Sequence, residues 1–427
     1  MSEVLKPMSL SNFRGKSFKD ILDLNRGMGL GFDVIRLGLA VLILLSHTSG
    51  IIGTNGTITA IMNWIFQIDG DSAAKIASAA TINATAVATP GHEPYGLTGL
   101  GRPITLSYLP MFFALSGFLV TGSALRTRKL LPFLGLRVLR LLPALFVEVA
   151  LSAVILGAVF TTLDLSAYYS SAGFWNYFWN IVGHVQFHLP GVFEQNRSTI
   201  VNANLWTLPW EFYCYLAMSL VIVAGLLGNR IILTVMFLCV TVVSLVLSFS
   251  IEFQVVPAHL SGFMLIYYFL AGMMFFLWRE KIIFHEAIFV ACAIVCYILM
   301  MSPRTVFIYP LLLTYMTVFI GLFPMRQFKL LKTGDYSYGI YLYGYPVTQA
   351  LVTAIPALKT SLVFAAPAAL AATALFAALS WHGVEKHCLK LKRYLSPKSA
   401  KINETLHPDA GLGNEGSKPD ARPEGSA

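Results

Sequence analysis

The stretch that decides the fold is FDVIRLGLAVLILLSHTSGIIG, which runs from Phe32 to Gly53. It is long and apolar enough to cross a bilayer as one helix. Arg36 and His47 interrupt it, and their eleven-residue spacing corresponds to about 1100°, or three turns and roughly 20°. Both side chains therefore point the same way, about 16 Å apart along the helix. Charged and imidazole groups inside a membrane are costly and usually functional. The alternative is that Arg36 snorkels to the headgroups while a neighbouring helix satisfies His47.

Composition identifies a membrane protein. The chain has 427 residues, of which 56% are hydrophobic and only 12% charged, and its mean hydropathy is +0.68. A soluble protein needs about twice that share of charge to cover its surface. We therefore predict an all-α, polytopic membrane protein with about ten transmembrane helices. The predicted spans lie near 33–53, 107–125, 141–163, 205–227, 230–250, 259–278, 284–301, 304–323, 336–355 and 361–381.

The distribution of positive charge predicts the orientation. Of the 30 Lys and Arg residues, 24 fall in segments on the side of the N-terminus, five fall on the other side, and Arg36 is within a span. The positive-inside rule then places both termini in the cytoplasm. The net charge of +9 is explained by this topology and by contact with anionic headgroups, and it gives no argument for nucleic acid as a partner.

The predicted organisation has three parts. Residues 1–32 form a cytoplasmic segment, 33–393 a membrane domain, and 394–427 a disordered cytoplasmic tail that is rich in Pro, Gly and charge. Two long extracytoplasmic loops interrupt the membrane domain. The first, 54–106, has the composition of a weakly structured spacer. The second, 164–204, is rich in aromatic and polar residues and is suited to covering a cavity at the membrane interface.

Metal and nucleotide chemistry have little support in the sequence. His184 and His188 have the i, i+4 spacing of a metal pair, but no third ligand accompanies them, so we predict no metal site. There is no phosphate-binding GxxxxGK[ST] loop and no HExxH motif. The five cysteines do not form the pattern of a disulfide framework.

Two further groups of polar residues lie at the ends of predicted spans. Arg137 and Arg140 are i, i+3 neighbours on the helix that enters the third span, and two guanidinium groups on one helix face suit phosphate. Their alternative role is ordinary positive-inside charge. Glu211 lies a few residues inside the fourth span, at its outer end, where His47 is the expected partner for its carboxylate. A structural role is the alternative for Glu211.

These motifs resemble the acyltransferase-3 family of integral membrane proteins. FDVIRLGLAVLILLSH is similar to the family's opening helix, in which ten residues separate an Arg and a His. MFFALSGFLVTGSALR (111–126) resembles its second span, and FLGLRVLRLLPAL carries its Arg-x-x-Arg motif. LWTLPWEFYCYL resembles the Trp-Ser/Thr-Leu-x-x-Glu signature, and DYSYGIYLYGYPV (335–347) resembles the Ser-Tyr-x-x-Tyr-Leu segment. One departure is Gly344, which stands where many members have a His, so Tyr341, Tyr343 or Tyr345 is expected to supply that polar contact.

The resemblance implies transfer of an acyl group, most often acetyl, from cytoplasmic acyl-CoA to a hydroxyl of an extracytoplasmic or lipid-linked glycan. His47 would be the base and Glu211 would orient it. An acyl-imidazole on His47 is an alternative route. The donor would be held by Arg36, Arg137 and Arg140. Substrate-binding or structural roles are expected for a further group of residues: Asp33, Trp206, Ser337, Tyr338 and Tyr341.

The remaining expectations concern partners and location. Acyl-CoA is a co-substrate, and no tightly bound cofactor is expected. The resemblance implies a bacterial inner membrane. A transporter or channel for an anionic solute, with Arg36 and His47 lining its path, is the main alternative function. A non-catalytic membrane subunit is a third.

Overall fold

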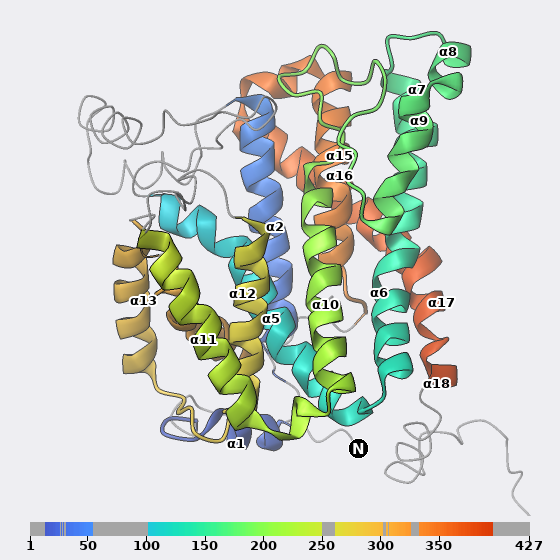
Figure 1. The fold of residues 1–427 in the computed structure, drawn as a ribbon. Coiled ribbons are helices and arrows are strands. Elements are labelled where there is room, and N and C mark those ends of the chain that lie inside the picture. Colours follow the sequence, from blue (N-terminus) through green and yellow to red (C-terminus); the bar gives the residue numbers. More distant parts are fainter. Residues whose placement is uncertain are drawn as a thin grey trace, which may run out of the picture.

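The protein is a bundle of helices, seen here in a computed structural model (Figure 1). The structure describes residues 13–25, 27, 29, 31–53, 101–249, 261–301, 305, 307–325 and 333–395. Within these ranges the chain forms no β-strand, and its only β-type pairings are the isolated bridges Ser17 to Ile283 and Thr161 to Val192. The predicted all-α class is confirmed for the described residues. Of the predicted spacer, 54–106, residues 54–100 lie outside them, whereas residues 102–106 are helical. Of the predicted tail, 394–427, residues 396–427 lie outside them, whereas residues 394 and 395 end a short helix.

Ten long helices run through the described part of the bundle. They are α2 (Phe32–Ile52), α5 (Arg102–Thr127), α6 (Leu130–Leu151), α10 (Leu208–Val223), α11 (Arg230–Phe249), α12 (Gly262–Leu277), α13 (Glu286–Met300), α14 (Pro310–Leu322), α15 (Ser337–Ala354) and α16 (Leu362–Ser380). Shorter pieces join or extend them: α1 (Phe18–Leu24), α8 (Leu165–Ser170), α9 (Ala172–Tyr177), α17 (Lys386–Leu389) and α18 (Lys392–Leu395), with 3-10 turns at Phe178–Val182, Ala203–Thr207, Leu226–Gly228 and Pro356–Thr360.

Each predicted span contains one of these helices, and five helices are long and apolar enough to cross a membrane. Those five are Phe32–Ile52, Pro103–Thr127, Leu130–Phe160, Ala203–Val223 and Leu362–Leu395. Four others are apolar but shorter: Arg230–Val246, Gly262–Leu277, Glu286–Met300 and Pro310–Leu322. These helices support a membrane protein, whereas the count of ten spans and the cytoplasmic termini stay predictions.

The third span begins much earlier than predicted. Helix α6 starts at Leu130 instead of near 141, and it continues through a π-helical turn, Ser152–Leu156, into α7 (Gly157–Phe160). This unbroken run of 31 residues is about 46 Å long. Arg137 and Arg140 are therefore inside the helix, two turns or more from its start.

Part of the predicted outer loop folds back along α6. The Tyr168 hydroxyl donates to the Ala153 carbonyl at 2.6 Å, and Phe174 and Tyr177 pack with Leu145 in one buried cluster. Because the segment 165–182 meets α6 at successively earlier positions, it runs antiparallel to that helix. It forms a second helical layer instead of an open loop.

Small residues let the central helices touch. A Cβ placed on Gly117 of α5 would lie 1.9 Å from the Phe269 carbonyl oxygen, and one on Gly272 of α12 would lie 2.0 Å from the Ala114 carbonyl oxygen. Such close approach through small residues is a common way for helices to associate inside membranes. Helices α5 and α12 are thus in contact backbone to backbone.

We expect Gly117→Ala to destabilise the fold strongly. The added methyl group meets backbone, which cannot rotate away, and overpacking of this kind typically costs about 1–3 kcal/mol or more. Gly38→Ala on α2 is the matched control, because no atom lies within 4 Å of its Cβ position. Thermal unfolding in detergent should show a lower midpoint for Gly117→Ala only. Equal midpoints for the two variants would contradict the packing.

The N-terminal segment lies against the connection between α12 and α13. Gly15 N–H donates to the Phe284 carbonyl at 2.9 Å, and Phe18 N–H donates to the Ile282 carbonyl at 2.9 Å. These two parts of the chain must therefore lie on the same side of any membrane. The charge distribution assigns that side to the cytoplasm.

Cysteine labelling tests this orientation. In a chain whose native cysteines are replaced with alanine, Thr360→Cys should react with an impermeant thiol reagent added outside intact cells. Lys281→Cys should react only after the cells are opened, because it lies on the side assigned to the cytoplasm. Both positions are exposed in the structure. The reverse pattern would overturn the predicted topology.

Candidate active site

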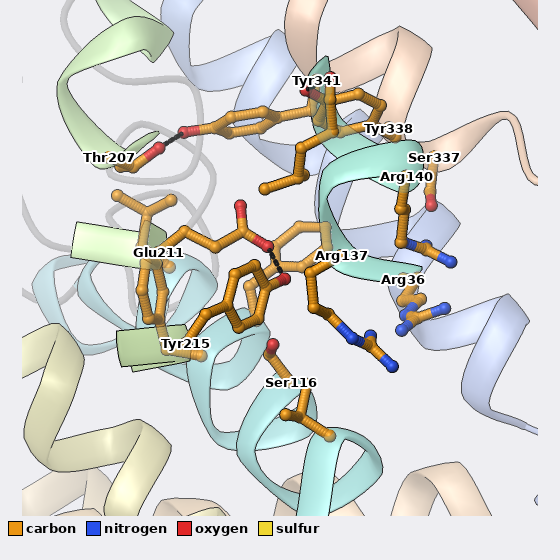
Figure 2. Close-up of a pocket in the computed structure, with 15 residues that line it drawn as sticks. Arg36, Ser116, Arg137, Arg140, Thr207, Glu211, Tyr215, Ser337, Tyr338 and Tyr341 are labelled. Atoms are coloured by element: carbon orange, nitrogen blue, oxygen red, sulfur yellow. Dashed lines mark hydrogen bonds between the residues drawn. The ribbon is translucent and has the colours of Figure 1, made fainter. Parts of the chain in front are cut away.

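A pocket lies among α2, α5, α6, α10 and α15. Its polar lining is Arg36, Ser116, Arg137, Arg140, Thr207, Glu211, Tyr215, Ser337, Tyr338 and Tyr341, and its apolar lining is Leu109, Phe112, Phe113, Val120 and Leu141. Figure 2 shows the three guanidinium groups gathered on one side of the pocket, with Glu211 and Tyr215 opposite them.

The three arginines line one pocket because α2 and α6 carry them at the same depth in the bundle. Arg36 comes from the second turn of α2, and Arg137 and Arg140 lie one turn apart on α6. An i, i+3 pair shares a helix face, so both α6 arginines reach the same space. The sequence predicted that these residues act together, and the structure brings them into one pocket.

Asp335, just before α15, joins two of the arginines. Its carboxylate lies 2.6 Å from Arg140 Nη2 and 3.7 Å from Arg36 Nη1, and it accepts a hydrogen bond from Ser337 Oγ at 2.6 Å. The side chains of Arg36 and Asp335 are 19% and 25% exposed, so solvent screens this cluster only in part. Asp335 holds Arg36 and Arg140 against each other despite their like charges.

Arg137 is held differently. Its Nη2 donates to Ser123 Oγ at 2.9 Å, and its guanidinium carbon lies 5.9 Å from the ring centre of Tyr215. Its Nε is buried without a hydrogen-bond partner, and no described carboxylate comes within 4.0 Å of it. A buried donor without a partner is costly, so Arg137 is ready to bind an anion.

Glu211 lies in the first turn of α10 and faces this pocket. Tyr215 donates its hydroxyl to the Glu211 carboxylate at 2.5 Å. Nearby, the hydroxyls of Thr207 and Tyr341 are 2.6 Å apart, and the Tyr341 hydroxyl also donates to the Asn204 carbonyl at 3.2 Å. These bonds connect α15 to the start of α10 at one edge of the pocket (Figure 2).

The expected pairing of His47 with Glu211 is wrong for the described residues. The imidazole of His47 lies within hydrogen-bonding reach of the Asn204 side chain, and it meets the Tyr345 ring edge to face at 5.2 Å between centres. Glu211 instead points to Tyr215 and the arginines. The reason is depth: α10 begins within the bundle, after the 3-10 turn Ala203–Thr207, so its first turn is level with the arginine pocket.

The other predicted residues divide into two groups. Ser337, Tyr338 and Tyr341 all line the pocket. Asp33 is exposed in the first turn of α2, where a carboxylate favours the helix N-terminus, and Trp206 is half-buried against the core. Tyr345 contacts the His47 ring edge to face, and the polar contact expected from Tyr341, Tyr343 or Tyr345 in place of a His at Gly344 stays a prediction.

Comparison with known proteins agrees with the motifs. A family model described as an acyltransferase domain matches residues 30–382. The chain belongs to the acyltransferase-3 family. An O-acetyl transferase of Shigella phage Sf6 is 26% identical over 334 residues, which cover 72% of this chain and 92% of that protein. No solved structure matches. The predicted family is confirmed, and this acyltransferase is an enzyme that transfers acyl groups.

Sequence reasoning missed two residues of this acyltransferase that hold others in place. Asp335 was part of a quoted motif, but only its hydroxyl-bearing neighbours were selected. Its position next to Ser337, at the start of a span, was the signal that could have identified it. Asn204 gave no comparable signal, because an uncharged amide in a polar stretch is common.

Proposed function

We propose that this enzyme transfers an acyl group, most simply acetyl, from cytoplasmic acyl-CoA to a hydroxyl of an extracytoplasmic or lipid-linked glycan. The observation that carries the proposal is the convergence of three guanidinium groups in one pocket, on the same face of α2 as His47. Family membership and the O-acetyl transferase relative support acyl transfer to oxygen. The CoA donor, the glycan acceptor and a bacterial inner membrane belong to the proposal.

The arginine pocket suits the charged part of the donor. Each guanidinium offers a planar fork of hydrogen-bond donors that fits phosphate oxygens. The buried Nε–H of Arg137 has no hydrogen-bond partner and could donate to a phosphate oxygen, whereas Asp335 keeps Arg36 and Arg140 in place. A phosphate placed here would leave the uncharged, flexible pantetheine arm to extend along α2.

His47 suits the chemical step. It lies about 16 Å along α2 from Arg36, so donor binding and chemistry would occur at different depths. The imidazole would take the proton of the acceptor hydroxyl as the oxygen forms a bond to the thioester carbonyl carbon. The carbon–sulfur bond then breaks, and CoA leaves as a thiolate that takes up a proton. Asn204 and Tyr345 would fix the orientation of the ring.

Glu211 then has a role at the donor side instead of at His47. Its carboxylate is held by Tyr215 and faces the guanidinium groups. In that place it would offset the repulsion among the like-charged guanidinium groups in the empty enzyme. An anionic donor would take over that role when bound.

Acyl transfer can be tested with purified enzyme in lipid vesicles. Acetyl-CoA labelled on the acetyl group is added together with a glycolipid extract of host membranes, and both free CoA and labelled glycolipid are measured. We expect both products to appear together, and neither with His47→Ala. A strain that lacks the gene should also lose about one acetyl group from a surface glycan, measured by mass spectrometry.

Two results would overturn the proposed function. One is the absence of CoA release and of label transfer while the surface glycans of the deletion strain keep their mass. The other is flux of an anionic solute into the same vesicles, lost in His47→Ala, without any label transfer. The second result would establish the transporter function instead.

A further inference from the structure

Glu148 is a buried carboxylate outside the arginine pocket. It lies near the end of α6 and is fully inaccessible to solvent. Its Oε1 accepts hydrogen bonds from Ser152 Oγ at 2.8 Å and from Asn202 Nδ2 at 2.9 Å. A buried carboxyl group is expensive unless it has hydrogen-bond partners, so these bonds fix where Asn202 can be.

Asn202 links Glu148 to the turn that precedes α10. Its Nδ2 also donates to the Leu342 carbonyl at 3.0 Å, and its Oδ1 accepts from Asn204 N–H at 3.0 Å. The second bond caps the 3-10 turn Ala203–Thr207. Glu148, on α6, and Leu342, on α15, thereby set the position of Asn204.

Asn204 is the residue that meets His47. Its Nδ2 donates to the Tyr341 carbonyl at 2.5 Å, and its side chain lies within hydrogen-bonding reach of the imidazole. A chain of hydrogen bonds therefore leads from Glu148 through Asn202 to Asn204, whose side chain adjoins the imidazole of His47.

The backbone next to Glu148 is also unusual. Helix α6 changes to a π-helical turn at Ser152–Leu156, and Ser152, the first residue of that turn, donates to Glu148. Such turns cost stability and are frequent at functional sites. Neither the fold nor the arginine pocket requires a carboxylate here.

We propose that Glu148 is a positioning residue for His47 and acts through Asn202 and Asn204. It therefore takes the part that the sequence assigned to Glu211. This inference rests on the proposed role of His47 in acyl transfer.

Two substitutions at one position test it. Glu148→Gln keeps an oxygen that accepts from Ser152 and Asn202, whereas Glu148→Leu keeps neither bond. We expect Glu148→Leu to lower kcat by about tenfold to a hundredfold, the loss typical of a misplaced group, with donor KM unchanged. Glu148→Gln should recover most of kcat. Glu385→Gln is the control, because Glu385 is also buried and accepts from Ser380 Oγ at 2.8 Å beside a second π-helical turn.

A double variant tests whether the two residues act through one chain. The single variant Asn204→Ala should lower kcat. The double variant with Glu148→Leu should lower kcat by no more than about twofold further, since both substitutions remove the same constraint. Independent losses that multiply would overturn the inference. A wild-type kcat in Glu148→Leu would also overturn it. So would a donor KM of Glu148→Leu that rises by the same factor as kcat falls.

A chemical readout separates this inference from the proposed function. Diethylpyrocarbonate modifies imidazole nitrogens, and peptide mass spectrometry gives the rate at His47 alone. If Glu148 positions the ring, Glu148→Leu and Asn204→Ala should change that rate by severalfold, and Glu385→Gln should not. An unchanged rate in protein that still elutes as a single species overturns the positioning role, whatever reaction the enzyme performs. Changed rates in a protein without acyl transfer would overturn only the proposed function.

Discussion

His47→Ala is expected to remove nearly all acyl transfer while leaving the protein folded. General base catalysis typically contributes about 10²–10⁴ in rate, and alanine provides no replacement for the imidazole. The side chain is half-buried beside Asn204 and Tyr345, so its loss leaves a small gap. The initial rate of labelled acetyl transfer should fall at least a hundredfold, with donor KM nearly unchanged.

His387→Ala provides the control for this experiment. His387 is exposed on α17, and its replacement should leave the rate at the wild-type value. More than about a third of the wild-type rate in His47→Ala would rule out general base catalysis by this residue. A rise in donor KM without a fall in kcat would instead place His47 in donor binding.

The second large effect concerns the donor. We expect Arg137→Ala to raise the donor KM by roughly tenfold to a hundredfold, because a charge-assisted hydrogen bond contributes about 1.5–3 kcal/mol. Arg137→Lys should recover part of this, since the ammonium keeps the charge but loses the planar fork. Steady-state rates at varied acetyl-CoA concentration give KM and kcat separately.

Arg140→Ala should behave differently from Arg137→Ala. Arg140 makes the shorter ion pair with Asp335, at 2.6 Å, so its loss leaves that carboxylate with the Ser337 hydrogen bond and the longer ion pair with Arg36. Lower protein yield is then expected together with a higher KM. Lys129→Ala removes a positive charge from the exposed start of the same helix and should change neither quantity. If Arg137→Ala, Arg140→Ala and Lys129→Ala all lower the protein yield equally and leave the donor KM unchanged, these three cations only set topology.

Sequence reasoning succeeded where one helix carried the information. The period of α6 predicted that Arg137 and Arg140 share a face, and the period of α2 predicted the same for Arg36 and His47. The grouping of Arg36 with Arg137 and Arg140 came from the family resemblance. Sequence reasoning failed where two helices had to be placed relative to each other. Glu211 was assigned to His47, but Asn204, from the 3-10 turn that precedes α10, adjoins the imidazole, and Glu211 lines the arginine pocket.

The same limit explains Asp335 and Asn204. Both act through partners more than 100 residues away in the chain, Arg140 and Tyr341, and a single sequence holds no record of such contacts. The family resemblance identified the motifs to which these residues are adjacent, but not the bonds that join one motif to another.

The glycine contact between α5 and α12 also bears on how the pocket opens. A bulky charged donor can enter and leave only if some part of the wall moves. Helix α5 forms one wall, and the backbone contacts at Gly117 and Gly272 bind it to α12, so these two helices should behave as a rigid frame. Motion that opens the pocket is then expected in its other walls, α2, α6, α10 and α15. If CoA is the donor, as proposed, its release would require these helices to move, and the speed of that motion could limit turnover more than the chemistry does.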